Sequence, residues 1–504
     1  MTWAELHGVL RRGGLIRADD AMGEEAVVGV VTGIAYDSRA ITPGQLFVAL
    51  RGQHADGASF ARQAIERGAT AVVSEQAAPD GVHVPWAIVG DARLALAVLA
   101  AAFYHDPSRE MRVIGITGTN GKTTTAYLIA SIFDAAGIRC GILGTVGYRI
   151  GDEVREATRT TPEAPEVQAL LREMVDQQCG ACAMEVSSHA LSLRRVDGIA
   201  FAAAIFTNLT RDHLDFHADM DDYFRAKRRL FEMLPRDAPS LLNLDDPRGV
   251  TLAEAGGRPM TYAINRPADV TPGPLSFSLA GLSLDVRTPR GALHVTSKLV
   301  GRPNVYNILA AVSAATALDV PLDSIERGLQ SLEGVPGRFE VVSDARDEVT
   351  VVVDYAHTDD ALRNLLETAR PLAPGRLITV FGAGGDRDRT KRPLMGAVAG
   401  RLSDLIVITS DNPRSEDPNR IIEEIQRGIT PDTRRDSAQA LLTIVDRGAA
   451  IAKAIEVARP GDVVLVAGKG HEKYQVIGDH TLPFDDVAVA REALVRRRTK
   501  SGVA

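Results

Sequence analysis

The residues best suited to chemistry form a glycine- and threonine-rich segment, GITGTNGKTT, at residues 115–124. It follows the apolar run 112–116 and opens a helical pattern, which is the context that a phosphate-binding loop requires. Glycines let backbone N–H groups turn toward phosphate oxygens, Lys122 can reach the outer phosphates, and Thr123 can ligate magnesium. Residue 116 is Ile where the common nucleotide loop has Gly, and an ordinary glycine-rich turn is the alternative. We predict a nucleotide site made by Gly118, Thr119, Asn120, Gly121, Lys122, Thr123 and Thr124.

Polar side chains follow two further apolar runs. Glu185 comes at the end of the run 181–186, and His213 lies in the segment TNLTRDHLDFH after the run 202–207. Ligands of open α/β sheets bind at the carboxyl ends of the strands, so Glu185 is well placed to hold magnesium. His213 can hold a second magnesium or its water. A solvated loop histidine is the alternative.

Lys227 lies in a helical segment, DYFRAKRRLF, whose aromatic and leucine side chains supply apolar contacts. From its neighbours alone it is interpreted as a surface lysine. Asn304, Arg338 and Asp354 have the local interpretation of caps and turns.

A second polar group follows apolar runs near the C-terminus. The segment DNPR, residues 411–414, follows the run 405–409 and places an asparagine and an arginine at the carboxyl end of a strand. A turn with a helix N-cap is the alternative. An arginine can bind a carboxylate through two parallel charged hydrogen bonds, so this segment can recognise an acid.

These segments together resemble a known family. GTNGKTT at 118–124 looks like the ATP loop of the Mur ligases and the folylpolyglutamate synthetases, and EVSSH, TNLTRDHLDFH and DNPR are similar to Mur ligase segments. The resemblance covers nearly the whole chain and is weakest in the first 30 residues. It implies an enzyme that uses ATP and Mg²⁺, with Lys227 carbamylated so that a cation is replaced by a carboxylate-like magnesium ligand.

The resemblance also assigns roles to individual residues. Lys122, Glu185, His213 and Lys227 would be catalytic, and the metal ligands would be Thr123, Glu185, His213 and the carbamate of Lys227. Asn304, Arg338 and Asp354 would join the loop in binding ATP. The UDP-linked substrate would contact Ser38, Thr160, Thr161, Ser187 and Arg195, with the stretch 52–57 resembling a further uridine-site element. Leu193 stands where the resemblance leads us to expect a glutamine, so the resemblance leaves one polar contact to that substrate unassigned. The amino acid would be bound by Arg387, Asp411, Asn412, Pro413, Arg414, Gly468 and Glu472.

The activity that the resemblance implies is an ATP-dependent amide ligation. It would add meso-2,6-diaminopimelate to UDP-N-acetylmuramoyl-L-alanyl-D-glutamate through an acyl phosphate, in the cell-wall synthesis on which cell shape and division depend. The DNPR segment resembles the family's diaminopimelate-selecting motif. An L-lysine-adding member, a folylpolyglutamate- or cyanophycin-type ligase, and a P-loop kinase or ATP-driven binding module are the alternatives.

Short β-branched runs alternate with helical patterns through most of the chain, which predicts an α/β protein. Composition breaks at 104–111 and at 334–337 divide it into three expected domains: 1–108, 109–336 and 337–504. The resemblance makes these a small α/β uridine-binding domain, a P-loop-type ATPase domain with a mostly parallel sheet, and a Rossmann-like amino-acid-binding domain.

Composition excludes other classes. The 504 residues are 45% hydrophobic and 24% charged, as in globular proteins and unlike disordered or fibrous chains. A net charge of −8 disfavours nucleic acid and membrane surfaces as partners. Three cysteines give no disulfide framework, and neither a signal pattern nor a membrane-length apolar run is present, so we expect a cytoplasmic protein. We also expect it to be a monomer.

Overall fold

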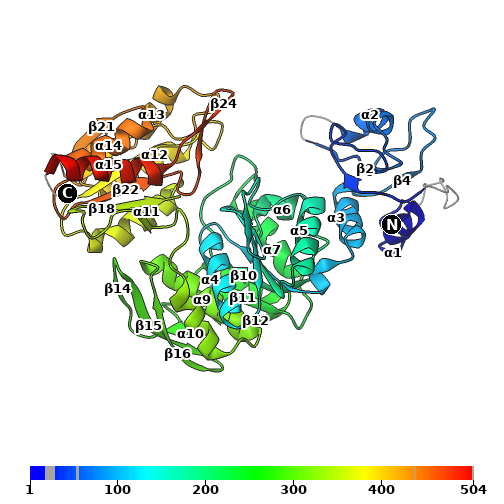
Figure 1. Cartoon of the computed structure of the whole chain (residues 1–504), viewed down its shortest axis with the longest axis horizontal. Helices are drawn as coiled ribbons and strands as arrows, with labels where there is room; N and C mark the ends of the chain where they lie inside the picture. Colours follow the sequence, from blue (N-terminus) through cyan, green and yellow to red (C-terminus); the bar gives the residue numbers. More distant parts are fainter. Residues whose placement is uncertain (18–28, 53–55, 437–438, 502–504) are drawn as a thin grey trace.

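The structure is a computed structural model and describes residues 1–17, 29–52, 56–436 and 439–501. Figure 1 shows three parts in a row, the N-terminal part on the right, a central part, and the C-terminal part on the left. The expected α/β class with mostly parallel sheets is confirmed. The large sheets fall one in each of the three expected ranges, whose exact limits stay predictions.

The N-terminal part is a four-stranded parallel sheet in the order β1-β2-β3-β4. Alanine and leucine side chains of α3 pack on one face of this sheet with Trp3 and Leu6 of α1. Its strands are β1 (Ile34–Ala35), β2 (Leu46–Val48), β3 (Ala71–Ser74) and β4 (Trp86–Ile88), and its helices are α1 (Trp3–Arg12), α2 (Ala61–Glu66) and α3 (Ala92–Phe103).

The central sheet has eight strands in the order β12-β11-β10-β5-β9-β6-β7-β8, parallel from β12 through β6 and antiparallel at the β7–β8 edge. Its strands are β5 (Arg112–Thr117), β6 (Cys140–Leu143), β7 (Tyr148–Ile150), β8 (Glu153–Arg155), β9 (Ala181–Glu185), β10 (Phe201–Phe206), β11 (Pro239–Asn243) and β12 (Arg258–Tyr262). The helices are α4 (Lys122–Ala135), α5 (Ala164–Asp176), α6 (Ser188–Ser192), α7 (Met220–Glu232), α8 (Pro247–Thr251), α9 (Arg302–Ala317) and α10 (Leu322–Ser331).

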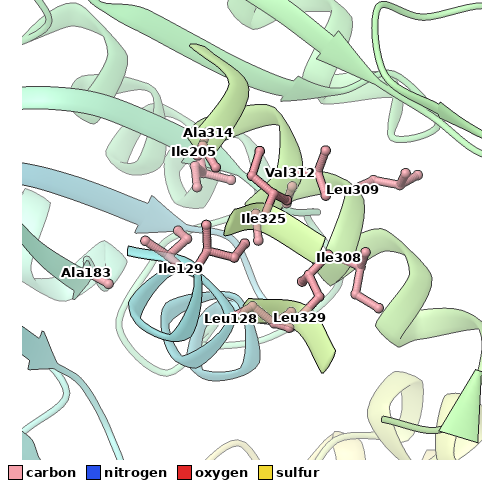
Figure 2. Close-up of a cluster of buried hydrophobic side chains, with 14 of the residues drawn as sticks. Leu128, Ile129, Ala183, Ile205, Ile308, Leu309, Val312, Ala314, Ile325 and Leu329 are labelled. Atoms are coloured by element: carbon pink, nitrogen blue, oxygen red, sulfur yellow. The ribbon is translucent and has the colours of Figure 1, made fainter. Parts of the chain in front are cut away.

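Apolar cores lie on both faces of the central sheet. One joins α4, α9 and α10 to the sheet through side chains such as Ile129, Ile205 and Leu309, shown in Figure 2. The other joins α5 and α7 to the opposite face through Leu171 and Leu230. A small antiparallel sheet of β13 (Thr271–Pro272), β14 (Ser276–Ser278), β15 (Gly281–Thr288) and β16 (Gly291–Ser297) packs against α10. Because both faces are packed, the central strands are apolar runs without alternation.

The C-terminal sheet has the order β17-β18-β22-β19-β20-β21, with only β17 antiparallel. Its strands are β17 (Glu340–Val341), β18 (Thr350–Asp354), β19 (Leu377–Phe381), β20 (Leu405–Ile408), β21 (Ala440–Thr443) and β22 (Val463–Ala467), with a separate hairpin of β23 (Tyr474–Ile477) and β24 (His480–Pro483). One face is covered by α11 (Asp359–Ala369), α12 (Lys391–Leu402) and α13 (Pro418–Gln426), and the other by α14 (Arg447–Val457) and α15 (Asp486–Ser501).

Two other sequence expectations can be compared with the described residues. All three cysteines are free and buried. In those ranges no helix is both long and apolar enough to cross a membrane.

Candidate active site

Two adjoining cavities lie where the central part faces the C-terminal part. One, of about 550 Å³, is lined by the 119–124 loop, Glu185 and Arg338, and the other, of about 740 Å³, by Arg414 and Glu472. Arg387, His213 and Thr160 line both. The walls come from residues that follow β5, β9, β10, β18, β19, β20 and β22, so the carboxyl ends of two parallel sheets face one space.

The loop between β5 and α4 has the backbone that a phosphate cradle needs. Gly118 and Gly121 have φ values of 148° and 87°, a region that disfavours side chains. A Cβ at Gly121 would lie 2.3 Å from the Asn307 side-chain oxygen. Asn120 N–H donates to Asn208 Oδ1 at 2.9 Å, and the loop leads into the first turn of α4. The predicted loop therefore has the required shape and opens into the cavity.

Two lysines contact the backbone of this loop, and Lys227 is the more deeply buried of them. Lys122 Nζ donates to Gly118 O at 3.0 Å and to Thr119 O at 2.8 Å, and Lys227 Nζ donates to Gly118 O at 2.8 Å. Burial lowers the pKa of Lys122, and burial followed by repulsion from Lys122 lowers the pKa of Lys227 far below its usual value.

The interpretation of Lys227 as a surface residue was wrong, because its side chain is only 1% exposed. One face of α7 is apolar, and Lys227 lies on that face one turn after Tyr223 and one turn before Leu230. Its Nζ lies 4.4 Å from the centroid of the Tyr223 ring. Position on the helix, rather than residue type, decides the burial of Lys227.

Glu185, at the end of β9, is a buried carboxylate facing the loop. It accepts hydrogen bonds from Thr145 N–H at 2.8 Å and from Thr145 Oγ1 at 3.1 Å, and Thr145 Oγ1 lies 3.0 Å from Thr160 Oγ1. The sequence did not single out Thr145, although it lies just after β6 and Glu185 ends β9, so the same strand-end rule applies to both.

His213 lies in a loop after β10 with a φ of 56°, an uncommon conformation for a residue other than glycine. Burial lowers its pKa to about 3, so the imidazole is neutral near pH 7. The His189 ring lies 4.9 Å from the His213 ring, and burial lowers the pKa of His189 to about 4. Two neutral imidazoles thus face the cavity.

The residues expected to contact the nucleotide from a distance in sequence line the same cavity. Arg338 Nη2 donates to Thr123 Oγ1 at 3.0 Å, and the guanidinium stacks on Tyr355 at 4.5 Å. Asp354 accepts from Phe339 N–H at 2.7 Å. Asn304 Nδ2 donates to Val300 O at 2.8 Å. Arg338 thereby joins the C-terminal part to the loop of the central part.

The second cavity has charged side chains from three loops of the C-terminal sheet. Asn412 Nδ2 donates to Glu472 Oε2 at 2.9 Å, and the buried Lys469 Nζ donates to the same oxygen at 3.0 Å. Arg414 Nη1 donates to Gly385 O at 2.7 Å. Asp411 and Gly468 also line this cavity, and Pro413 is not among its lining residues.

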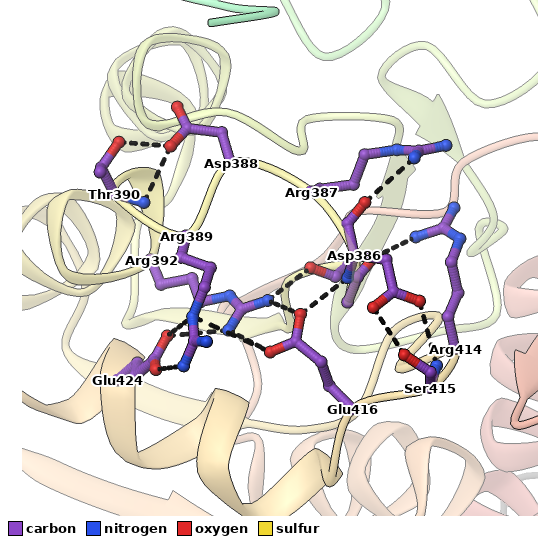
Figure 3. A network of polar contacts seen from close by, with 12 residues as sticks. Asp386, Arg387, Asp388, Arg389, Thr390, Arg392, Arg414, Ser415, Glu416 and Glu424 are labelled. Carbon is purple, nitrogen blue, oxygen red and sulfur yellow. Dashed lines mark hydrogen bonds and ion pairs between the residues drawn. The ribbon is translucent and has the colours of Figure 1, made fainter. Parts of the chain in front are cut away.

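Arg387 and Arg414 differ from the other arginines nearby. Arg387 Nη1 donates to the Asp386 carbonyl at 3.1 Å, as Figure 3 shows. Within residues 1–17, 29–52, 56–436 and 439–501, neither guanidinium forms an ion pair with a carboxylate. Two cations therefore face the cavity with their charge available to a bound acid.

The residues assigned to the UDP-linked substrate fall into two groups. Thr160, Thr161, Ser187 and Arg195 line the first cavity, with Arg195 paired to Glu163 at 2.8 Å. Ser38 lies apart from them, next to β1, where its hydroxyl donates to Gln63 Oε1 at 2.7 Å. Residues 53–55 of the stretch 52–57 lie outside the described residues.

The described ranges hold no cluster of three His, Cys, Asp or Glu side chains suited to a metal. Glu185 and the Thr123 hydroxyl nevertheless face the same space beside the phosphate loop. Magnesium usually takes one or two carboxylates, keeps waters and binds phosphate oxygens for the rest, so a small donor set of this kind fits magnesium bound with a nucleotide.

Models of three families match the chain. Residues 30–104 match "Mur ligase family, catalytic domain", residues 116–315 "Mur ligase middle domain", and residues 337–470 "Mur ligase, glutamate ligase domain".

Similar proteins agree with these matches. The UDP-N-acetylmuramoyl-L-alanyl-D-glutamate–2,6-diaminopimelate ligase of Solibacter usitatus is 48% identical over 467 residues, 92% of this chain and 93% of that protein. A solved structure of an enzyme with the same name is 34% identical, covers 99% of both chains and has a TM-score of 0.69. The MurF ligase of Thermotoga maritima in complex with ADP shares the fold, with 18% identity, a TM-score of 0.61, and coverage of 93% of this chain and 97% of that one.

Proposed function

The chain belongs to the Mur ligase family, and we propose that it joins meso-2,6-diaminopimelate to UDP-N-acetylmuramoyl-L-alanyl-D-glutamate at the expense of ATP. The observation that carries the proposal is that a phosphate loop and two unpaired arginines line adjoining cavities. The name shared by relatives that cover over 90% of the chain supports the same reaction.

ATP binds across the two parts of the chain in this proposal. The loop from Gly118 to Thr124 holds the phosphates, with Lys122 on the outer ones. Arg338, which already contacts Thr123, binds the phosphates from the C-terminal part, and Asn304 and Asp354 bind the base or ribose. The ADP complex of the Thermotoga maritima relative supports nucleotide binding by this fold.

A carboxylate is a poor electrophile until one oxygen becomes part of a leaving group. The γ-phosphoryl group passes to the D-glutamyl carboxylate, and Lys122 neutralises charge as it moves. The neutral amine of diaminopimelate then forms the C–N bond, the C–O bond to phosphate breaks, and the amine releases a proton. No protein nucleophile is needed.

Thr123, Glu185 and a carbamate on Lys227 would hold magnesium, with His213 holding a second ion or its water. Magnesium supplies charge shielding and orientation for the phosphates. The lowered pKa of Lys227 supports the modification, because a neutral amine adds to CO₂, forming an N–C bond and releasing a proton. The product is an anion, so the repulsion between Lys227 and Lys122 would become an attraction.

In the amino-acid pocket, Arg387 and Arg414 bind carboxylate groups and Glu472 binds an ammonium group, supported by Asp411, Asn412 and Gly468. Diaminopimelate carries a second amino-acid head that lysine lacks, which gives both arginines a partner. Thr160, Thr161, Ser187, Arg195 and Ser38 bind the UDP-linked substrate. We assign the reaction to a monomer in the cytoplasm.

Phosphate release tests the proposal. ATP is incubated with both co-substrates and with each one omitted. We expect release only when the UDP-dipeptide and diaminopimelate are both present. Release that needs neither, or only one of them, would instead indicate a kinase or an ATP-driven binding module.

A further inference from the structure

The two unpaired arginines lie on loops that are far apart in sequence. Arg387 belongs to residues 382–390, here named the β19 loop, and Arg414 belongs to residues 409–417, here named the β20 loop. The distance between the two guanidinium groups must match the carboxylate groups that they bind, because each bidentate contact needs a fixed guanidinium geometry. The side chains that join these loops therefore control the fit of the substrate.

Arg392, at the start of α12, joins them directly. Its side chain is fully buried. Nη1 donates to Glu416 Oε2 at 2.9 Å and to Glu424 Oε2 at 2.8 Å, while Nη2 donates to Glu416 Oε1 at 2.7 Å and to Gly384 O at 3.1 Å. One guanidinium thus holds the backbone of the β19 loop and a carboxylate of the β20 loop (Figure 3).

The contact continues toward both pocket arginines. Glu416 Oε1 also accepts from Asp386 N–H at 2.7 Å, next to Arg387. The Asp386 carboxylate accepts from Ser415 N–H at 3.1 Å and from Ser415 Oγ at 2.7 Å, next to Arg414. Asp386 has a φ of 52°, a strained conformation that these hydrogen bonds hold in place.

The glutamates in or next to the two loops are paired with arginines outside the cavity lining. Glu424 pairs with Arg389 and Arg392, and Glu416 pairs with Arg392 at 2.7 Å. The hydrogen bonds from Arg392 lower the pKa of Glu416 to about 2, so its carboxylate is charged near pH 7. With Arg392 in place, this negative charge is balanced beneath the pocket and does not compete for Arg414.

We propose that Arg392 is a positioning residue for the amino-acid substrate, which fixes the spacing of Arg387 and Arg414 and keeps Glu416 away from them. This inference rests on the proposed function. Arg392 itself lies outside both cavities, so it acts through the two loops. Loss of Arg392 should therefore weaken the binding of the amino acid and leave the binding of ATP unchanged.

The test compares Arg392→Gln and Arg392→Lys with the wild type by steady-state kinetics for all three substrates. Gln keeps a donor but cannot span Gly384 and both glutamates, so KM for diaminopimelate should rise about tenfold or more, with KM for ATP and for the UDP-dipeptide changing by less than about twofold. Arg392→Lys keeps the charge without the planar fork, so its KM for diaminopimelate should lie between the values of the wild type and of Arg392→Gln. The preference for diaminopimelate over L-lysine should fall in the same order.

Arg376→Gln is the matched control. Arg376 pairs with Asp462 at 2.7 Å next to the opposite ends of the strands of the same sheet, and should lose stability without a change in KM for diaminopimelate. If Arg392→Gln does not fold, Glu416→Gln breaks the same connection from the other loop and should raise the same KM.

An unchanged KM for diaminopimelate in a folded variant, or an equal rise for all three substrates, would overturn the positioning role. Failure of the proposed function gives a different result, because the wild type would then release phosphate without diaminopimelate.

Discussion

Buried cations have opposite surroundings in the central and C-terminal parts. Lys122 and Lys227 donate to carbonyl oxygens, and burial lowers the pKa of both. Arg447 is as buried as Lys227, and burial opposes its charge, but Asp486 at 2.6 Å raises its pKa. Arg392, between two glutamates, likewise has a raised pKa, against the effect of burial.

We interpret this difference as a difference in role, between cations that can bind a ligand and cations that hold loops together. A buried lysine without a carboxylate partner costs stability, and its charge or its amine remains available for a ligand. A buried arginine with its carboxylates is chemically satisfied and holds loops together. Within the described residues, Lys122 and Lys227 contact the backbone of the predicted phosphate loop, and Arg392 and Arg447 lie beneath the loops of the proposed amino-acid pocket.

The largest expected effect is at Lys227. Lys227→Ala should reduce turnover by about a thousandfold or more, because the proposed carbamate ligand is lost, while the free energy of unfolding should change little, because the lost hydrogen bond to Gly118 O and the relieved burial of a polar group oppose each other. Phosphate release and urea unfolding measure the two effects. Arg228→Ala, at a half-exposed position on the same helix, should leave turnover nearly unchanged, and normal turnover of Lys227→Ala would show that this lysine is only structural.

The next effect is on stability in the C-terminal part. Asp486→Asn leaves the fully buried Arg447 without its partner and should lower the free energy of unfolding by about 3–5 kcal/mol. Urea unfolding measures it, with Asp323→Asn of the exposed Arg327 pair as a control expected to cost less than about 0.5 kcal/mol. A loss below about 1 kcal/mol in Asp486→Asn would remove the distinction between supporting and acting cations.

The Arg414→Ala variant tests the proposed pocket whose loops Arg392 and Arg447 hold. Arg414→Ala should weaken diaminopimelate binding by about 1.5–3 kcal/mol, roughly ten- to a hundredfold in KM, since a charged hydrogen-bond donor is lost. KM for ATP should not change. The same substitution at Arg420, an exposed residue on α13, is the control, and identical kinetics in the two variants would count against the role of Arg414.

The smallest effect extends the comparison to His471, a half-buried base. Burial lowers the pKa of His471 from 6.5 to about 3, so the unfolded chain binds more protons between these values and stability is lost as the pH falls below about 6.5. From pH 7 to pH 5 the wild type should lose on the order of 1–2 kcal/mol more than His471→Gln. Urea unfolding at both pH values checks this, with His480→Gln, at an exposed site, expected to behave as the wild type. Equal losses would contradict it.

Local features of the site could be predicted from the sequence. The phosphate loop needs only a strand, glycines and the start of a helix, which are all contiguous, and Glu185 and His213 follow from the strand-end rule. The buried strands β5, β9, β10 and β20 were expected because both of their faces are apolar. Short or partly exposed strands such as β8 and β24 carry no such signal and were missed.

Features that depend on contacts between distant residues could not be predicted. The burial of Lys227 depends on the packing of α7, and the connection of Arg392 to Glu416 joins two loops. The pairing of Arg447 with Asp486 likewise joins α14 to α15. The identity of the substrate pockets came from resemblance, since a DNPR turn by itself is equally a turn with a helix cap.

Product formation in a direct competition tests the central claim, that this chain is a ligase selecting diaminopimelate. The enzyme, ATP and UDP-N-acetylmuramoyl-L-alanyl-D-glutamate are incubated with equal concentrations of meso-diaminopimelate and L-lysine, and the products are identified by mass. We expect the diaminopimelate adduct in large excess, with one phosphate released per adduct. A lysine adduct in equal amount would contradict the pocket assigned to Arg414, and phosphate released without any adduct would contradict the ligase itself.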